Sequence, residues 1–408
     1  MAKIKEFKGL RPPVDLVSKI AELPYDVCSS KEAKEKAGDN KLNFFHISKP
    51  EIDLPEDTDP YDEKVYLKGA ENLNSFISEG YFREDSQEKL YFYTLIMNGR
   101  EQSGLVTCVS IDDYLNDIVK KHEFTREEKE NDRIRHLDVL NAQTGLVFLL
   151  YRENGSKKDL WRKALSISPE YDFTADDGIR HIFRLINDPV LINEFRNAFA
   201  DEVLYIADGH HRAASAVKNG VSRRERNANH NGSEEYNYFL SVIFPHDHLQ
   251  ILPYNRVLAD LNGMDSDAVL EKIGKKFRID KNGQKNPVSS GSFCMYLENS
   301  WYTVTADFEI PSDAVNSLDV SLLQNFILDP VFDIKDPRKS KRIDFIGGIR
   351  GTEELEKLVN SGAYKIAFSM FPTSVIDLIN VSDSGHVMPP KSTWFEPKLR
   401  SGIILHKI

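Results

Sequence analysis

Residues 203–217, VLYIADGHHRAASAV, hold the densest set of side chains in this chain that could do chemistry. The apolar run 203–207 predicts a buried strand, and Asp208 and Gly209 predict a tight turn. A helix is expected to start at Ala213 and to stop near Asn219 and Gly220. A helix that opens at a glycine turn presents unpaired backbone N–H groups at the positive end of its dipole, where phosphate binds. The pattern therefore predicts phosphate handling.

The predicted turn carries a carboxylate, two imidazoles and a guanidinium, from Asp208, His210, His211 and Arg212. A single histidine before a helix is usually a satisfied cap, but four adjacent polar groups after an apolar strand favour a functional site. Adjacent histidines on one turn do not converge easily on one ion, and no H-x-x-x-H or C-x-x-C pattern supports them. Structural zinc is therefore not expected.

A second block combines a helix start with two chemically active side chains. Thr125 and Glu128 have the spacing of a capping box, which predicts a helix that begins at Arg126. His122 and Glu123 lie just before this cap, at a loop-to-helix junction. Because a junction can direct a side chain into a cleft, we expect both residues at the functional site.

The predicted helix has a polar face with Lys129, Arg133 and His136. Its apolar face has Ile134, Leu137 and Leu140. The interior charges are expected to form a solvated face with ion pairs. Arg133 is nevertheless kept as a candidate for substrate binding, together with His122 and with Asp26 of the turn-rich segment LPYDVCSS.

The third block, MPPKSTWFEPKLRSG at residues 388–402, contains prolines that prevent regular structure and predict a rigid loop. One ammonium and two hydroxyls on this loop suit an anion, and they belong to Lys391, Ser392 and Thr393. A packing loop held by Trp394 and Phe395 is an equally good interpretation.

Three further segments are expected to be ordinary surface. Strand alternation would place His181 and Arg184 outward. The polar stretch 222–235 predicts a mobile loop. His246 and His248 have a metal-ligand spacing, but a hairpin tip exposes such residues, so a metal is not the favoured interpretation.

Composition excludes several classes of protein. The 408 residues carry a formal charge of -11 and 40% apolar residues, which argues against a nucleic-acid surface and for an ordinary globular protein. Three widely spaced cysteines form no disulfide framework, and no apolar run is long enough to cross a bilayer. We therefore expect a cytoplasmic protein that binds neither nucleic acid nor membrane.

Strands and helices alternate to the end of the chain without internal repeats, which predicts a mixed α/β fold. Borders are expected in loops near residues 150 and 260. They would divide the chain into an N-terminal α/β region at 1–150, a core with the DGHHR turn at 151–260, and a C-terminal α/β region at 261–408.

The DGHHR turn resembles the G-x-x-R phosphate turn of the ParB/sulfiredoxin superfamily, and it is most similar to the run of the same residues in free serine kinases. The resemblance implies a ParB/sulfiredoxin-like nucleotide-binding core with large α/β elaborations on both sides. Sulfiredoxins have a nucleophilic cysteine where this chain has His210, so sulfiredoxin chemistry is not implied.

Over nearly its full length the chain also resembles a bacterial and archaeal family of unknown function. The match is carried by LPYDVCS, NFFHISKPE, KHEFTREEKENDR, ADGHHRAASA and MPPKSTWFEPKLRSG. Members of that family tend to be encoded beside enzymes of the phosphoserine pathway, which agrees with the kinase resemblance.

Together these resemblances imply a kinase that uses ATP or ADP to convert free L-serine to O-phosphoserine. Phosphates would lie on the amides after Gly209, with charge neutralised by His210, His211 and Arg212, and Mg²⁺ would be held with help from Asp208. The expected phosphate contacts also include Lys391, Ser392 and Thr393.

The general base is left open between Asp208, Glu123 and Asp26, and His211 is expected to be essential for catalysis. Two other functions are also left open: a ParB-like module that binds or hydrolyses a nucleotide to regulate a partner, and a non-catalytic sensor of the serine pathway. The sequence leaves open whether the chain forms a homodimer.

Overall fold

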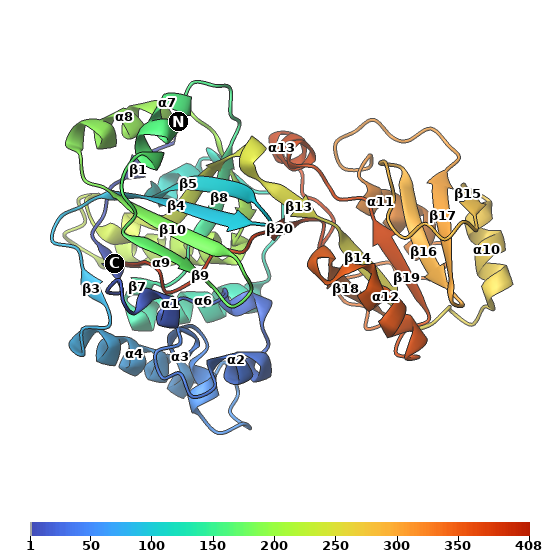
Figure 1. The fold of residues 1–408 in the computed structure, drawn as a ribbon, viewed down its shortest axis with the longest axis horizontal. Coiled ribbons are helices and arrows are strands. Elements are labelled where there is room, and N and C mark those ends of the chain that lie inside the picture. The colour runs from blue at the N-terminus through green and yellow to red at the C-terminus, as the bar shows by residue number, and fades with distance from the viewer. Residues whose placement is uncertain (1) are drawn as a thin grey trace. The chain divides into compact units, whose positions relative to one another are not determined.

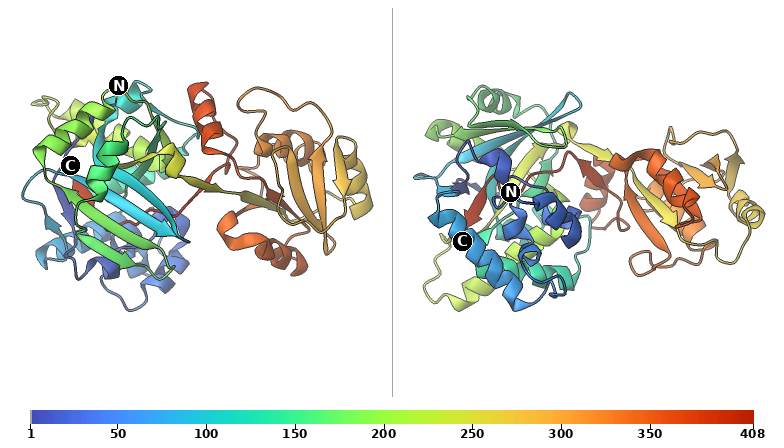
Figure 2. Two further views of the ribbon diagram at one scale, coloured as in Figure 1. Left: turned by 45° about the horizontal axis from the view of Figure 1, so that its top comes forward. Right: turned by 60° about the horizontal axis from the view of Figure 1, so that its bottom comes forward.

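The computed structural model describes residues 2–408, which divide into two compact units. The first unit runs to Leu249 and also includes Pro397–Ile408, whereas the second is Gln250–Glu396. Figures 1 and 2 show that the last strand of the chain, drawn in red, belongs to the first unit. The second unit is therefore an insertion in the first.

The first unit is built on a nine-stranded sheet of mixed direction (Figure 1). Its strands lie in the order β6 (Val119–Lys120), β11 (Leu204–Asp208), β8 (Val147–Tyr151), β12 (Tyr238–Pro245), β5 (Arg100–Ser110), β4 (Leu90–Met97), β10 (Arg180–Ile186) and β9 (Tyr171–Thr174), with β1 (Ile4–Lys5) paired to β5. β11 is parallel to β6 and β12 is parallel to β8, and the other pairs are antiparallel. The stretches 1–150 and 151–260, expected as separate regions, both contribute strands to this sheet.

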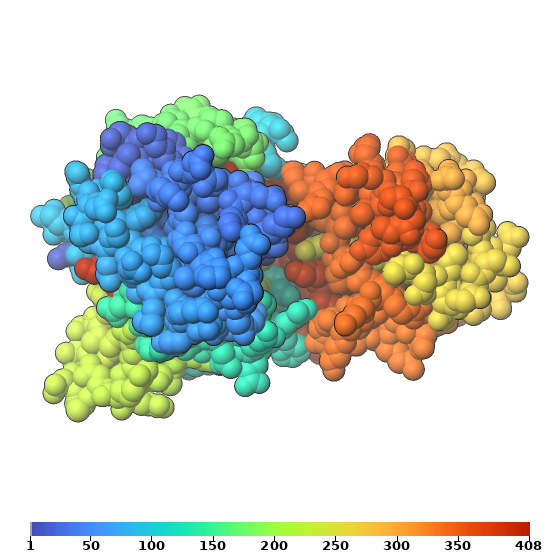
Figure 3. Space-filling view, turned by 90° about the horizontal axis from the view of Figure 1, so that it is seen from below, coloured from blue at the N-terminus to red at the C-terminus, as the bar shows by residue number. Residues whose placement is uncertain are grey.

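Nine helices and a small sheet complete the described part of the first unit. The helices are α1 (Val17–Ile20), α2 (Ser30–Ala37), α3 (Phe45–Ser48), α4 (Glu63–Ser78), α5 (Ile111–Leu115), α6 (Glu127–Leu140), α7 (Lys158–Leu165), α8 (Pro189–Phe199) and α9 (His210–Arg226). The small sheet has the order β3 (Arg83–Glu84), β2 (Gly9–Arg11), β21 (Leu405–Lys407) and β7 (Ala142–Gln143). The N-terminal segment with α2 to α4, drawn in blue, covers the middle of the face of this unit seen in Figure 3.

A large apolar cluster lies on one face of the nine-stranded sheet. β8 is buried along its whole length, and its alternate residues Val147, Leu149 and Tyr151 join one apolar cluster. Trp161 of α7 and Val217 of α9 pack in the same cluster, so these helices are held against this face. Burial of apolar surface of this extent is the dominant stabilising term in folding.

The strand and turn before α9 are as predicted, but the helix is longer than expected. It begins at His210 instead of Ala213, and it ends at Arg226 instead of near Gly220. Gly220 lies inside the helix, and its lack of a side chain allows close packing: a Cβ atom there would lie 2.4 Å from the carbonyl oxygen of Tyr236. The first residues of the expected surface loop 222–235 are consequently helical.

Helix α6 begins at Glu127, and no side chain caps it, so the predicted capping box is wrong. The Thr125 hydroxyl instead donates to the Glu130 carboxylate. On the face expected to be solvated, His136 is buried with Nε2 3.0 Å from the Ile47 carbonyl and Arg133 is 13% exposed, whereas Lys129 is exposed. Two other charged residues of this helix are buried: Tyr66 of α4 donates to Asp132 at 3.0 Å, and Ser215 of α9 donates to the Glu130 carbonyl at 3.1 Å. The charges are buried because they contact residues from distant parts of the chain.

His181 and Arg184 of β10 are buried, which corrects the expectation that they point to solvent. His181 Nδ1 lies 2.8 Å from the Tyr93 hydroxyl, and Arg400 of the C-terminal segment lies against the other ring nitrogen. Arg184 Nε donates to the Ile167 carbonyl at 2.9 Å. Alternation was a poor guide because both faces of the sheet are covered at this strand.

The second unit holds a six-stranded sheet, a two-stranded ribbon and four helices. The sheet has the order β15 (Phe277–Asp280), β17 (Ser300–Ala306), β16 (Ser292–Leu297), β19 (Ile366–Met370), β14 (Tyr254–Leu258) and β18 (Ile343–Gly347), and the ribbon pairs β13 (Gln250–Leu252) with β20 (Trp394–Glu396). The helices are α10 (Ser266–Gly274), α11 (Asp319–Leu323), α12 (Gly351–Asn360) and α13 (Val375–Asp383). The fold of the chain is mixed α/β, as predicted.

Within residues 2–408, no helix combines the length and the apolar character that crossing a bilayer requires.

Candidate functional site

The turn between β11 and α9 is shaped by Gly209. This residue has a φ of 91°, in the left-handed region, and its N–H donates to Asp208 Oδ1 at 2.8 Å. The next three residues, His210 to Arg212, form the first turn of a 17-residue helix, where no helical carbonyl is available to their N–H groups. These N–H groups and the helix dipole together make a site suited to an anion.

Asp208 is held by a lysine from the far end of the chain. Lys398 Nζ lies 3.2 Å from Asp208 Oδ2, so both carboxylate oxygens accept hydrogen bonds. Burial alone would raise the pKa of Asp208, but the positive charges of Lys398 and Arg212 lower it well below its usual range. Asp208 is therefore ionised at neutral pH and is a weak proton acceptor.

His122 and His210 pack against each other at the turn. Their ring centroids are 4.5 Å apart, and His210 Nε2 accepts the His122 backbone N–H at 3.5 Å. Burial lowers the pKa of His122 to about 4 and the pKa of His210 well below its ordinary value. The two rings are consequently uncharged at neutral pH.

His211 is also constrained by a backbone contact. Its Nε2 accepts the Arg126 N–H at 3.1 Å, which leaves the ring proton on Nδ1, and burial lowers its pKa. Neutral imidazoles can donate hydrogen bonds but do not supply positive charge. The positive charge beside Asp208 comes from Arg212 and Lys398, and the charge that the sequence led us to expect from His210 and His211 is absent at neutral pH.

Arg212 joins the turn to a neighbouring loop. One terminal nitrogen donates to the Leu146 carbonyl, and the other lies 3.7 Å from Asp26 Oδ2. Its Nε is buried and has no hydrogen-bond partner among residues 2–408. Arg212 thus has an unused donor at the site.

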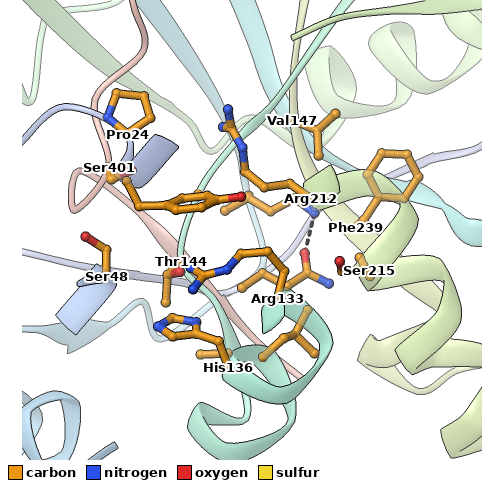
Figure 4. A pocket seen from close by; sticks show the side chains of 17 residues that line it. Pro24, Ser48, Arg133, His136, Thr144, Val147, Arg212, Ser215, Phe239 and Ser401 are labelled. Atoms are coloured by element: carbon orange, nitrogen blue, oxygen red, sulfur yellow. Dashed lines mark hydrogen bonds between the residues drawn. The ribbon is translucent and has the colours of Figure 1, made fainter. Parts of the chain in front are cut away.

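A cavity of about 40 Å³ lies beside Arg212 in the first unit (Figure 4). Arg133 crosses the middle of the view, between Arg212 and His136. Arg133 Nε donates to Asp132 Oδ2 at 2.8 Å, and its guanidinium lies 4.1 Å from the ring centre of Tyr25. Polar side chains in the lining also include Ser48, Gln143, Thr144, Ser215 and Ser401.

Most of the predicted site residues lie together in the first unit. Contacts around one turn connect Asp26, His122, Arg133, Asp208, Gly209, His210, His211 and Arg212, with Glu123 next to His122 in the chain. Sequence reasoning missed Lys398, Tyr25 and Ser48. Lys398 belongs to the EPKLRSG part of the third block and Tyr25 precedes Asp26 in LPYDVCS, so both were within segments that had been singled out.

Lys391, Ser392 and Thr393 belong to the second unit. Lys391 has a φ of 59°, and its carbonyl accepts a hydrogen bond from Arg256 at 3.1 Å. The Ser392 hydroxyl donates to the Pro389 carbonyl at 2.6 Å. These bonds fix the loop, and the role of its ammonium and hydroxyls toward phosphate stays a prediction.

No group of three or more histidine, cysteine, aspartate or glutamate side chains in residues 2–408 could hold a metal ion. His246 and His248 instead accept backbone N–H groups of Glu153 and Ser103, at 3.0 and 3.5 Å. Asp208 is a single carboxylate whose Oδ2 already accepts from Lys398. An Mg²⁺ ion at the turn would therefore need phosphate and water oxygens for its remaining ligands, as is common for this ion.

The sequence profile of the family described as "Protein of unknown function (DUF1015)" matches residues 4–321, and the chain belongs to this family. No curated protein matches the chain. Several solved structures are similar at low level. A free serine kinase in complex with AMP has 14% identity and a TM-score of 0.36, over 71% of this chain and 86% of that chain.

A conserved hypothetical protein from Pyrococcus furiosus has 14% identity and a TM-score of 0.36, over 72% of this chain and 93% of that chain. SbnI with a C-terminal truncation, from Staphylococcus aureus, has 10% identity and a TM-score of 0.38, over 72% of this chain and 85% of that chain.

The buried imidazole of His122 predicts a pH dependence of stability. Its pKa is about 4 in the folded chain against an ordinary 6.5, so the unfolded chain binds more protons between these values. The free energy of unfolding should therefore fall as pH falls below 6.5, by about 2 kcal/mol from this group between pH 7 and pH 5. Urea unfolding at both pH values should show this loss reduced by that amount in His122→Gln.

His386→Gln is the control, because His386 is exposed and its ring contacts only the hydroxyl of Ser384, with no ion pair in the described chain. It should lose as much stability on acidification as the unchanged chain. Equal acid sensitivity of His122→Gln and the unchanged chain would contradict a neutral, buried His122.

Proposed function

We propose that this protein is a nucleotide-dependent phosphotransferase that transfers a phosphoryl group to the hydroxyl of a small molecule, with free L-serine as the preferred acceptor. The observation that carries the proposal is the first turn of α9, where N–H groups without a helical carbonyl partner lie next to Arg212 and the Asp208–Lys398 pair. The likeness of the DGHHR turn to the ParB/sulfiredoxin superfamily and to free serine kinases supports it.

In this proposal the terminal phosphates of ATP or ADP lie on the N–H groups of His210, His211 and Arg212. Arg212 and Lys398 supply positive charge, and the neutral imidazoles act as hydrogen-bond donors. Preorganised donors and charges of this kind stabilise the charge that develops on a transferring phosphoryl group. Mg²⁺, held with help from Asp208, would supply further neutralisation of the phosphate charge.

The acceptor hydroxyl needs a base within hydrogen-bond reach. Asp208 is poorly suited, because Lys398 and Arg212 stabilise its ionised form. Asp26 lies 3.7 Å from Arg212, and Glu123 follows His122, which contacts His210. The proposal therefore assigns the base to Asp26 or Glu123.

The deciding experiment incubates the full chain with ATP, ADP or CTP, Mg²⁺ and a panel of free amino acids. Phosphorus NMR then follows O-phosphoserine and the nucleotide products. Serine-dependent turnover supports the kinase. Hydrolysis without an acceptor would support the regulatory nucleotide module, and nucleotide binding without turnover would support the sensor.

Gly209→Ala should weaken ATP and ADP binding by about tenfold or more. A Cβ atom at this left-handed residue would lie 3.1 Å from the Arg212 guanidinium, so the turn and the arginine must both shift. Gly155→Ala is the matched control, since Gly155 has the same φ of 91° with nothing within 4 Å of its added Cβ. Calorimetric titration should show a loss of affinity in the first variant alone, and equal affinities would remove the turn from the nucleotide site.

Glu123→Gln and Asp26→Asn should separate the two candidate bases. The variant that removes the base should lower kcat by about 10²–10⁴-fold, because proton removal from the hydroxyl is lost. Its nucleotide affinity should stay near that of the unchanged chain. A kcat that survives both substitutions would contradict the assignment of the base to this pair.

A further inference from the structure

We infer that the cavity between Arg133 and Arg212 is a recognition pocket for the carboxylate of a small organic acid, amino acids included. The inference rests on the proposed function in one respect, because it gives the phosphoryl acceptor a chemical class. The acid itself can be tested without any nucleotide.

Arg133 is the principal ligand of this pocket. Within residues 2–408 its hydrogen bonds and ion pairs involve Nε alone, which pairs with Asp132 at 2.8 Å. Its side chain is only 13% exposed, and it lines the cavity with both terminal nitrogens unused. A guanidinium offers two parallel N–H donors that match the two oxygens of a carboxylate.

Two further donors at the cavity are buried without partners. Ser48 at the end of α3 is 4% exposed, and its hydroxyl makes no hydrogen bond within the described chain. Arg212 Nε is also buried without a hydrogen-bond partner within the described chain. Buried polar groups are nearly always satisfied, so orphaned donors on two elements that line one cavity point to a bound acceptor.

Size and charge favour a carboxylate over a phosphate or a nucleotide. The cavity of about 40 Å³ has room for about three water molecules, since one water needs on the order of 10–15 Å³. Asp132 and Asp26 formally balance the charges of the two arginines. A singly charged ligand therefore adds less uncompensated charge to the cavity than a doubly charged one.

The test measures binding to the full chain without nucleotide, by calorimetry and saturation-transfer NMR. The probes are L-serine, glycolate, L-serinamide and inorganic phosphate. We expect L-serine and glycolate to bind and L-serinamide, which lacks the carboxylate, to bind at least about tenfold more weakly. Arg133→Gln should weaken both acids by about tenfold or more, because a charged bidentate contact is lost.

Arg135→Gln is the control, since Arg135 lies on the same helix but pairs at the surface with Glu63. It should leave acid binding unchanged. The inference is overturned if neither acid binds, if L-serinamide binds as well as L-serine, if phosphate binds more tightly than both acids through Arg133, or if Arg133→Gln and Arg135→Gln behave alike.

Ser48→Ala keeps the test decisive if Arg133→Gln does not fold. It removes a hydroxyl that has no partner in the free protein, so the variant should be at least as stable as the unchanged chain. It should weaken acid binding by about three- to tenfold, and unchanged binding would contradict the pocket. ATP binding is measured on the same variants, so that the two proposals can be separated. Acid binding without ATP binding would contradict the nucleotide site alone, and ATP binding without acid binding would contradict the acid pocket alone.

Discussion

The packing of Arg212 between two glycines is the constraint on which the site depends. A Cβ atom at Gly209 would lie 3.1 Å from its guanidinium, and one at Gly145 would lie 3.3 Å from its Cδ. The space left by the missing side chains lets a long cation enter from the helix start and reach the Leu146 carbonyl. One residue therefore borders both the turn and the cavity, so the two subsites share a positive charge.

At the candidate site, positive charge and neutral hydrogen-bonding groups belong to different side chains. His122, His210 and His211 all have lowered pKa values because they are buried, and they are neutral at physiological pH. Positive charge comes from side chains whose ordinary pKa values are far higher, such as Arg212 and Lys398. The charge of the site should then be nearly constant across the pH range in which unperturbed histidines titrate.

Local patterns predicted what depends on local structure, namely the strand before Asp208, the glycine turn and the mixed α/β fold. They failed where burial depends on distant contacts. The sequence predicted solvent-exposed charges on α6, yet Tyr66 and Ser215 of other helices contact its residues Asp132 and Glu130. Likewise, Lys398 lies 190 positions from its partner Asp208, a pairing that no periodicity or spacing encodes. The cavity could not be predicted from the sequence for the same reason, since Ser48, Arg133 and Arg212 come together only in the folded chain.

The order of the chain has a consequence for biosynthesis. The first unit lacks Pro397–Ile408 until the inserted Gln250–Glu396 has been made, and that closing segment carries Lys398 and the strand β21. During translation Asp208 is therefore made before Lys398, and their ion pair forms only after the whole inserted unit has been synthesised. A chain that terminates within the inserted unit would lack both Lys398 and β21, so the Asp208–Lys398 pair and the small sheet would be incomplete.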